Sequence, residues 1–219
     1  MHPLFEAIKA GDSSRVTALV DADPSLANAV DENGQSALIT AKYQRKDEIV
    51  RALEARGATL DIFAASMLGR VERIEELTSG NRSLASAVSR DGWTPLHLAA
   101  FYGQPEAARA LLNKGAVAGA RSSNPMQNMP LHAAAAGQSH EIAKLLLDHG
   151  ASPNARQQGG WTPLHAAAQN GDLEMARILL AAGADLEIRA DNNQLPLDMA
   201  LLKGRQTMVD FLERNGAHL

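Results

Sequence analysis

The sequence has no cysteine among its 219 residues. This absence excludes disulfide bonds, thiolate metal sites and cysteine nucleophiles. Aromatic residues make up only 4% of the chain, so the core must be built from Leu, Ala, Ile and Val. Because Ala and Leu lead the helix-propensity scale, this composition favours helices.

Long apolar runs and clusters of basic residues are also missing. There is no run of about 18 apolar residues, so no membrane-spanning segment is expected. The N-terminal stretch MHPLFEAIKAG lacks a basic region followed by an apolar run. We therefore expect no signal peptide and a cytoplasmic protein. The net charge is −4, and no basic patch is long enough to suggest nucleic acid or a membrane as partner.

What the chain does contain is an internal repeat, which is typical of solenoid proteins. A Thr-Pro-Leu-His-like motif recurs at intervals of 35, 33 and 33 residues, with its leucine at Leu96, Leu131, Leu164 and Leu197. The glycine that ends each unit keeps the same intervals, at Gly115, Gly150, Gly183 and Gly216.

A longer period of 58 residues organises the N-terminal part. A shift of 58 aligns Phe5 with Phe63 and Gly34 with Gly92, so segment 4–60 resembles a duplicate of the following one. Together the two periods predict seven helix pairs, with first helices starting near Leu4, Leu38, Ile62, Leu96, Leu131, Leu164 and Leu197. No composition break separates them. We expect one domain over residues 1–219, with approximate units 2–31, 32–60, 61–89, 90–121, 122–156, 157–189 and 190–219.

Local signals define the ends of the helices. The Thr94 hydroxyl is expected to cap the helix that begins at Pro95, where proline costs no hydrogen bond. Gly103 is expected to end that helix in a left-handed conformation. Arg45 and Gln138 occupy the same stop position in two other units, where glycine would be usual.

The motif Gly-Trp-Thr-Pro-Leu-His at 92–97 and 160–165, with a later Leu-Leu-x-x-Gly-Ala, resembles the ankyrin repeat. The match is strongest in residues 90–219 and degenerate in 1–89. The resemblance implies an all-α solenoid whose helix pairs are followed by β-hairpin fingers, with a concave surface that binds other proteins. Only four residues separate Gly57 from Ile62, too few for two strands and a turn. We therefore expect one missing finger there, with uninterrupted helix stacking.

Neither a metal site nor an enzyme active site is predicted. Stacked helices lie about 8–10 Å apart, whereas the nitrogen ligands of one zinc ion lie within about 2.1 Å of it. The histidines of successive repeats are therefore expected to hydrogen-bond in the first helical turn, at His97, His132 and His165. No nucleophile or phosphate-binding motif is present, so we expect no enzyme and no cofactor. The periodic carboxylates of the second helices indicate a solvated face, at Glu106, Glu141 and Glu174.

Candidate binding residues precede the ends of the first helices, which the resemblance places on the concave surface. This row is apolar and aromatic in the middle, at Tyr43, Met67, Phe101 and Tyr102. It becomes polar at Gln169 and Asn170, and Trp93 and Trp161 stand at the base of the fingers. An alternative is that Tyr43, Met67 and Phe101 pack on one another and close the notch left by the missing finger. Likewise, each tryptophan has the alternative of capping its own repeat by packing on the next one.

These residues favour a module that binds an unidentified protein partner through a rigid groove and hairpin tips. We expect a monomer, with no nucleic acid or membrane as partner. Two alternatives remain open. The first is a self-associating structural or scaffold protein, and the second is an accessory module that senses a small ligand in the notch.

Overall fold

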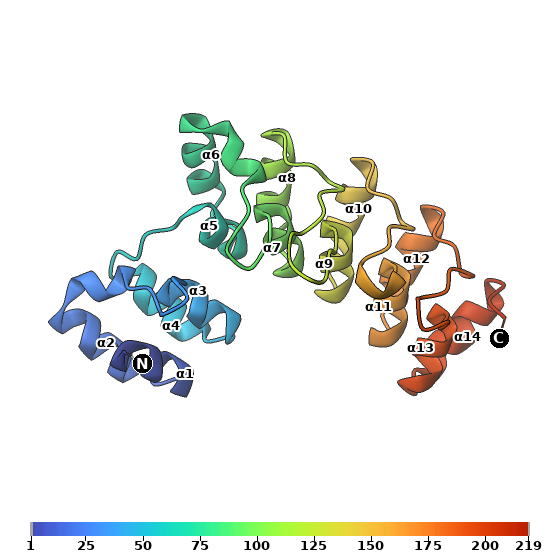
Figure 1. Ribbon diagram of the computed structural model, residues 1–219, viewed down its shortest axis with the longest axis horizontal. Coiled ribbons are helices and arrows are strands. Elements are labelled where there is room, and N and C mark those ends of the chain that lie inside the picture. The colour runs from blue at the N-terminus through green and yellow to red at the C-terminus, as the bar shows by residue number, and fades with distance from the viewer. Residues whose placement is uncertain (1, 219) are drawn as a thin grey trace. The chain divides into compact units, whose positions relative to one another are not determined.

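The computed structural model describes residues 2–218. Over that range the chain forms 14 α-helices and three short 3-10 helices, with no β-strand. The α-helices follow one another as seven pairs (Figure 1), which confirms the all-α prediction. The first helices of the pairs are α1 (Pro3–Ala10), α3 (Ala37–Tyr43), α5 (Ile62–Leu68), α7 (Pro95–Phe101), α9 (Pro130–Ala136), α11 (Pro163–Asn170) and α13 (Pro196–Leu202).

Each first helix is followed by a second helix that ends the pair. The second helices are α2 (Ser13–Ala22), α4 (Asp47–Glu54), α6 (Val71–Gly80), α8 (Pro105–Asn113), α10 (His140–Asp148), α12 (Leu173–Ala181) and α14 (Gln206–Arg214). The 3-10 helices are η1 (Pro24–Asn28), η2 (Arg82–Ser86) and η3 (Gln158–Gly160). None of the helices in residues 2–218 is long and apolar enough to cross a membrane.

The chain divides into two compact units, Met1–Ala64 and Ala65–Leu219, which we describe separately. Because the boundary falls within α5, a single domain over residues 1–219 stays a prediction. So does the uninterrupted stacking of helices on either side of residues 57–62. In the first unit, α1 packs against α3 and α2 against α4. Leu4, Ile8 and Leu53 are fully buried in its core.

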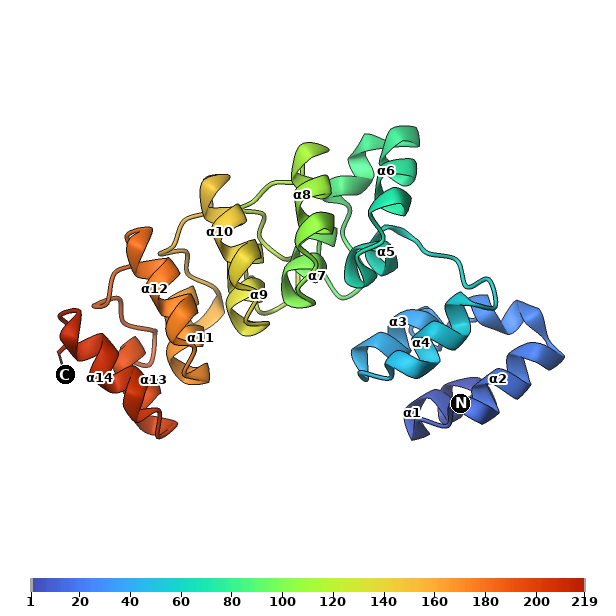
Figure 2. The ribbon, with the colours of Figure 1, turned by 180° about the vertical axis from the view of Figure 1, so that it is seen from behind.

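The second unit stacks its helix pairs side by side. The first helices α7, α9, α11 and α13 pack in sequence, as do the second helices α6, α8, α10 and α12. Figures 1 and 2 show the two sets of helices along opposite edges of this stack. Small buried side chains favour the close packing of neighbouring first helices, and equivalent positions of α7, α9 and α11 hold a fully buried alanine: Ala99, Ala134 and Ala167.

The connections between repeats are tight turns, shorter than the predicted β-hairpin fingers. At residues 157–161, the Gln157 N–H donates to the Trp161 carbonyl over 2.9 Å and the Gly160 N–H donates back to Gln157 over 3.0 Å. The same two bonds close turns at 31–35, 89–93 and 190–194. The segments on either side of each turn are too short to form paired β-strands. The described residues contain one isolated β-bridge, between Val30 and Ser36. Residues 58–61 carry neither strand nor turn, which confirms the missing finger.

The helix ends follow the local signals in the sequence. Thr94 accepts from the backbone N–H of His97 and caps α7, as predicted. Gly103 has φ of 66°, in the left-handed region. Arg45 and Gln138, at the same stop position, both have φ of 56°. Left-handed backbone thus ends these helices even where glycine is absent.

Buried histidines join the repeats of the second unit. The Nδ1 atom of His165 accepts from the Thr162 backbone N–H over 3.1 Å, inside its own turn. Its proton must therefore sit on Nε2, which donates to the Gln194 carbonyl of the next repeat over 3.1 Å. Equivalent Nε2 bonds run from His97 to Asn128 (3.0 Å) and from His132 to Trp161 (3.1 Å). The predicted role in the first turn is confirmed, and each ring also bridges two repeats.

Burial keeps these imidazoles neutral. It lowers the pKa of His97 and of His132 to about 4. It also lowers the pKa of His165. Since an unfolded chain has histidines with a pKa of about 6.5, the unfolded state binds more protons than the folded state between these values. Stability must therefore fall as the pH falls through that window.

This linkage predicts that acid unfolds the second unit. Between about pH 7 and pH 5, His97 and His132 should each lower the free energy of unfolding by up to about 1.4 kcal/mol per pH unit, and His165 should act in the same direction. Urea titrations followed by tryptophan fluorescence measure this unit alone, because Trp93 and Trp161 both lie in it. His132→Gln should be less stable at neutral pH but show a shallower pH slope. An unchanged slope, or a midpoint that rises in acid, would contradict the linkage.

Candidate binding surface

The ends of four first helices form a row on the surface of the second unit. Equivalent positions of successive repeats are occupied by Phe101, Ala136, Gln169 and Leu202. They form a row because their helices pack side by side. Phe101 is 40% exposed and Leu202 is 65% exposed, while Ala136 is exposed and Gln169 is half-buried.

The aromatic end of this row is held by ring packing. The Phe101 and Tyr102 rings meet edge to face, with centroids 5.2 Å apart and an interplanar angle of 84°. Tyr102 is half-buried and Phe101 presents its ring to solvent. Tyr43, at the end of α3 in the first unit, is 36% exposed. These three predicted residues are therefore accessible to some degree.

Met67 departs from the prediction. Its side chain is fully buried, so it belongs to the core and does not line an exposed surface. The physical reason is that residues 64–67 of α5 (IFAASML) are all buried, which is a full helical turn, so the helix is covered on every side at that point. Ile62, Ala65 and Ser66 of the same helix are buried as well.

Both tryptophans pack on their own repeats. The Trp93 ring lies 5.5 Å from the His97 ring at 63°, and the Trp161 ring lies 5.6 Å from His165 at 41°. Each indole therefore covers the imidazole that bridges to the next repeat. Both tryptophans remain half-buried, so part of each ring reaches the surface. These contacts lie within one repeat, so packing on the next repeat stays a prediction, as does a binding role for the exposed part.

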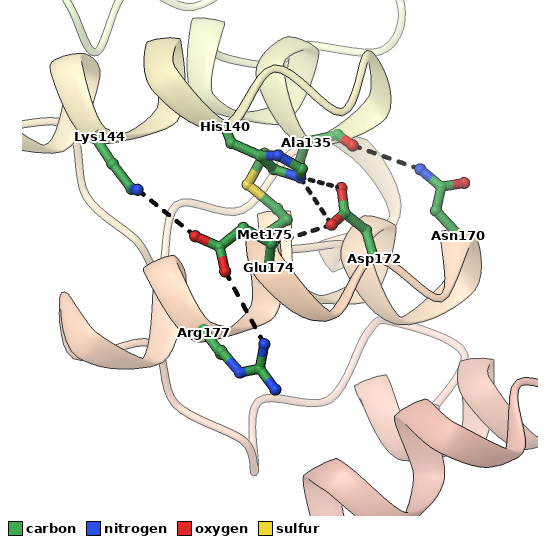
Figure 3. A network of polar contacts seen from close by, with 8 residues as sticks. All are labelled: Ala135, His140, Lys144, Asn170, Asp172, Glu174, Met175 and Arg177. Carbon is green, nitrogen blue, oxygen red and sulfur yellow. Dashed lines mark hydrogen bonds and ion pairs between the residues drawn. The ribbon is translucent and has the colours of Figure 1, made fainter.

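The polar candidates also make contacts within the fold. The Asn170 side chain donates to the Ala135 carbonyl over 3.4 Å and links α11 to α9 (Figure 3). The Gln169 backbone carbonyl accepts from Arg205 Nε over 3.4 Å. Both residues are half-buried. Gln169 belongs to the row and Asn170 follows it directly. One N–H of the Asn170 side chain is already used in the hydrogen bond to the neighbouring repeat.

Gly137 lies directly against the backbone of Phe101. A Cβ atom at this position would overlap the Phe101 carbonyl oxygen and approach its Cα to 3.1 Å. The φ of Gly137 is −85°, so it is close approach, and not a left-handed backbone, that requires glycine here. This explains why the glycine of that repeat comes one residue before the stop.

A buried carboxylate joins the second helices α10 and α12 (Figure 3). The side chain of Asp172 is 5% exposed, and His140 Nε2 lies 2.8 Å from both of its oxygens. The same carboxylate caps α12 by accepting from the Met175 N–H over 3.0 Å. This pair escapes sequence reasoning because its members are 32 residues apart, although an acidic residue directly before a helix was an available signal.

The periodic carboxylates make exposed ion pairs within and between the second helices. Arg109 lies 3.6 Å from Glu106 and 3.7 Å from Glu141, and Lys144 lies 3.5 Å from Glu174. Exposed pairs of this kind contribute about 0–1 kcal/mol each. The interpretation as a solvated face is confirmed. Within residues 2–218, no group of three histidine, aspartate or glutamate side chains is placed to hold a metal ion.

The close approach at Gly137 predicts a cost for any side chain there. Gly137→Ala should destabilise the second unit by roughly 1–3 kcal/mol, because the new methyl group overlaps the Phe101 backbone. Urea denaturation provides the measurement. Gly119→Ala is the matched control, since Gly119 is exposed and a Cβ there would meet no neighbour within 4 Å. Equal stability of the two variants would refute this steric account.

The contact between His140 and the buried Asp172 carboxylate predicts strong coupling between repeats five and six. A double-mutant cycle of His140→Ala and Asp172→Ala should give a coupling energy of roughly 1–3 kcal/mol, as expected for residues in direct contact. The same cycle on Arg109 and Glu141 should give less than about 0.5 kcal/mol, because that pair is exposed. Unfolding in urea measures all the variants. If the two cycles give the same coupling energy, the carboxylate does not join the repeats as described.

Comparison with known proteins agrees with this architecture. A family model described as ankyrin repeats (3 copies) matches residues 62–157 and 131–219. Over 127 residues the chain is 30% identical to a probable E3 ubiquitin-protein ligase, XBOS31, of Oryza sativa subsp. japonica. The match covers 53% of the chain but only 28% of that relative. Ankyrin repeats are general modules for protein–protein interaction. Because the family matches cover well over half of its length, the chain belongs to the ankyrin repeat family.

Proposed function

We propose that the chain is a non-enzymatic module that binds a protein partner on the surface formed by the ends of its first helices. The single observation that carries this proposal is the 40% exposure of Phe101 on a packed support. The Tyr102 ring fixes it from one side, and Gly137 lies against its backbone. An exposed aromatic ring on a rigid support is the kind of anchor that concentrates binding energy in protein interfaces.

Rigidity supports this function. Association costs free energy for every side chain and loop that must be ordered on binding. Here the row lies on helices that are joined by buried histidine bonds and that pack through buried alanines. The residues of the row are therefore already ordered in the free chain. Trp93 and Trp161 stand before the N-terminal ends of α7 and α11 with partly exposed rings, and we propose them as secondary contacts. We also propose that the turn tips contribute, and that the protein acts as a cytoplasmic monomer.

Photocrosslinking in cells tests the site. The photoreactive residue p-benzoylphenylalanine should give a heavier adduct when it replaces Phe101, and no comparable adduct when it replaces Arg109 among the exposed ion pairs. Adducts only at position 109 would overturn the proposed surface. An adduct that consists of two copies of the chain would favour the self-associating alternative, which light scattering at two concentrations then measures.

The contribution of the aromatic pair is tested on the captured partner. Phe101→Ala combined with Tyr102→Ala should weaken binding by at least about tenfold, because anchor residues contribute more than about 1.4 kcal/mol. Circular dichroism should show unchanged helix content and melting. Loss of the fold in this double variant would show that the rings are core, and unchanged affinity would show that they are not anchors.

A further inference from the structure

The second unit separates charged from uncharged helices. Helices α7, α9 and α11 contain no Asp, Glu, Lys or Arg. The remaining first helix α13 contains only Asp198, which is half-buried and accepts from the Leu195 N–H over 2.7 Å. The second helices α8, α10, α12 and α14 each carry at least two charged residues. The ends of the first helices thus form an uncharged row beside a charged stack.

Among the described residues just after the ends of these helices, exposed charged residues stand in the last repeat, whereas Asp172 of the preceding repeat is buried and paired with His140. Lys203 follows Leu202 in the chain and is exposed. Arg205 directs its Nε atom to the Gln169 backbone carbonyl, 3.4 Å away. Over the repeats that carry Phe101, Ala136 and Gln169, the row itself offers no charge to a ligand. A ligand that brings unpaired charges would lose their hydration there without compensation.

The dimensions of the row select the shape of the ligand. Three steps between neighbouring helices, at about 8–10 Å each, separate Phe101 from Leu202 by roughly 24–30 Å. An extended chain advances about 3.3 Å per residue, so about eight residues cover that span. Both ends of the row are apolar. Between them lies Gln169, whose side-chain amide can donate and accept hydrogen bonds.

We propose that this row binds an extended, uncharged segment of a partner protein, about eight residues long, with an apolar side chain near each end. The inference rests on the proposed function and names the chemistry of the partner. Phe101 and Leu202 contact the two apolar side chains. The central repeats offer only small and amide side chains, which let the backbone of the segment approach and hydrogen-bond.

Selection from a random peptide library tests this inference without knowledge of the partner. The probe is a phage-displayed library of peptides about twelve residues long, long enough for the eight-residue span, selected against the full chain. Enriched peptides should have a net charge near zero and two apolar residues about seven to nine positions apart. Because no ion pair is involved, the Kd of a synthetic selected peptide should change less than about twofold between about 50 and 500 mM salt.

Alanine variants test whether the selected peptide binds to the row. Phe101→Ala and Leu202→Ala should each weaken its binding by about tenfold, measured by fluorescence polarisation. Val117→Ala is the matched control, because Val117 is 60% exposed but follows a second helix. It should leave the Kd unchanged. Equal effects of Val117→Ala and Phe101→Ala would overturn the assignment to the row.

Two further outcomes overturn the inference. The first is enrichment of acidic or basic peptides whose binding weakens more than about tenfold with salt. The second is no enrichment at all. If crosslinking at position 101 still captures a protein in that case, the proposed function stands and the partner uses a folded surface. If crosslinking fails as well, the binding surface itself is wrong.

Discussion

The hydrogen bond from a buried, neutral imidazole to the carbonyl of the next repeat fixes the geometry of the second unit. It needs three things at once. The ring must be oriented by its own helical turn, its proton must lie on Nε2, and the neighbouring carbonyl must lie 3.0–3.1 Å away. A change in the distance between neighbouring repeats would break this bond and leave a buried polar atom unpaired, which costs about 1–3 kcal/mol. The spacing of every surface residue along the stack follows from this requirement.

The N-terminal repeats reach a similar result without that histidine. Phe5 occupies the equivalent position and is almost fully buried, so apolar packing replaces the bond. A polar link persists, because the Asn28 side chain accepts from the Thr59 N–H of the next repeat over 2.7 Å. Asn154 makes the same contact with Asp185 over 2.8 Å in the second unit. The asparagine hydrogen bond between repeats therefore occurs in both units, whereas the histidine hydrogen bond occurs in the second unit.

The sequence predicts the helices well because the signals for them are local or strictly periodic. The cap at Thr94 and the stop at Gln138 depend on a few neighbouring residues, and the missing finger follows from the length of one connection. The prediction for Met67 fails because a full turn of α5, residues 64–67, is buried, and this depends on the surroundings of the helix and not on its local sequence. The contact between His140 and Asp172 also escapes prediction, since it depends on how two repeats register in space.

The four repeats of the second unit allow equivalent positions of the candidate surface to be compared within one chain. The position of Phe101 is occupied by alanine, glutamine and leucine in the three repeats that follow. All four repeats form the same helix pair, so the fold accepts a small, a polar or an aliphatic side chain at this position. The buried Leu96, Leu131 and Leu164 show the opposite behaviour, since that core position holds leucine each time. A ring that stays 40% exposed gains only part of the stabilisation that burial gives, at a position where the fold sets no requirement. This separates Phe101 from the residues around it that the repeat explains, and it is the reason for proposing that a partner surface covers the ring.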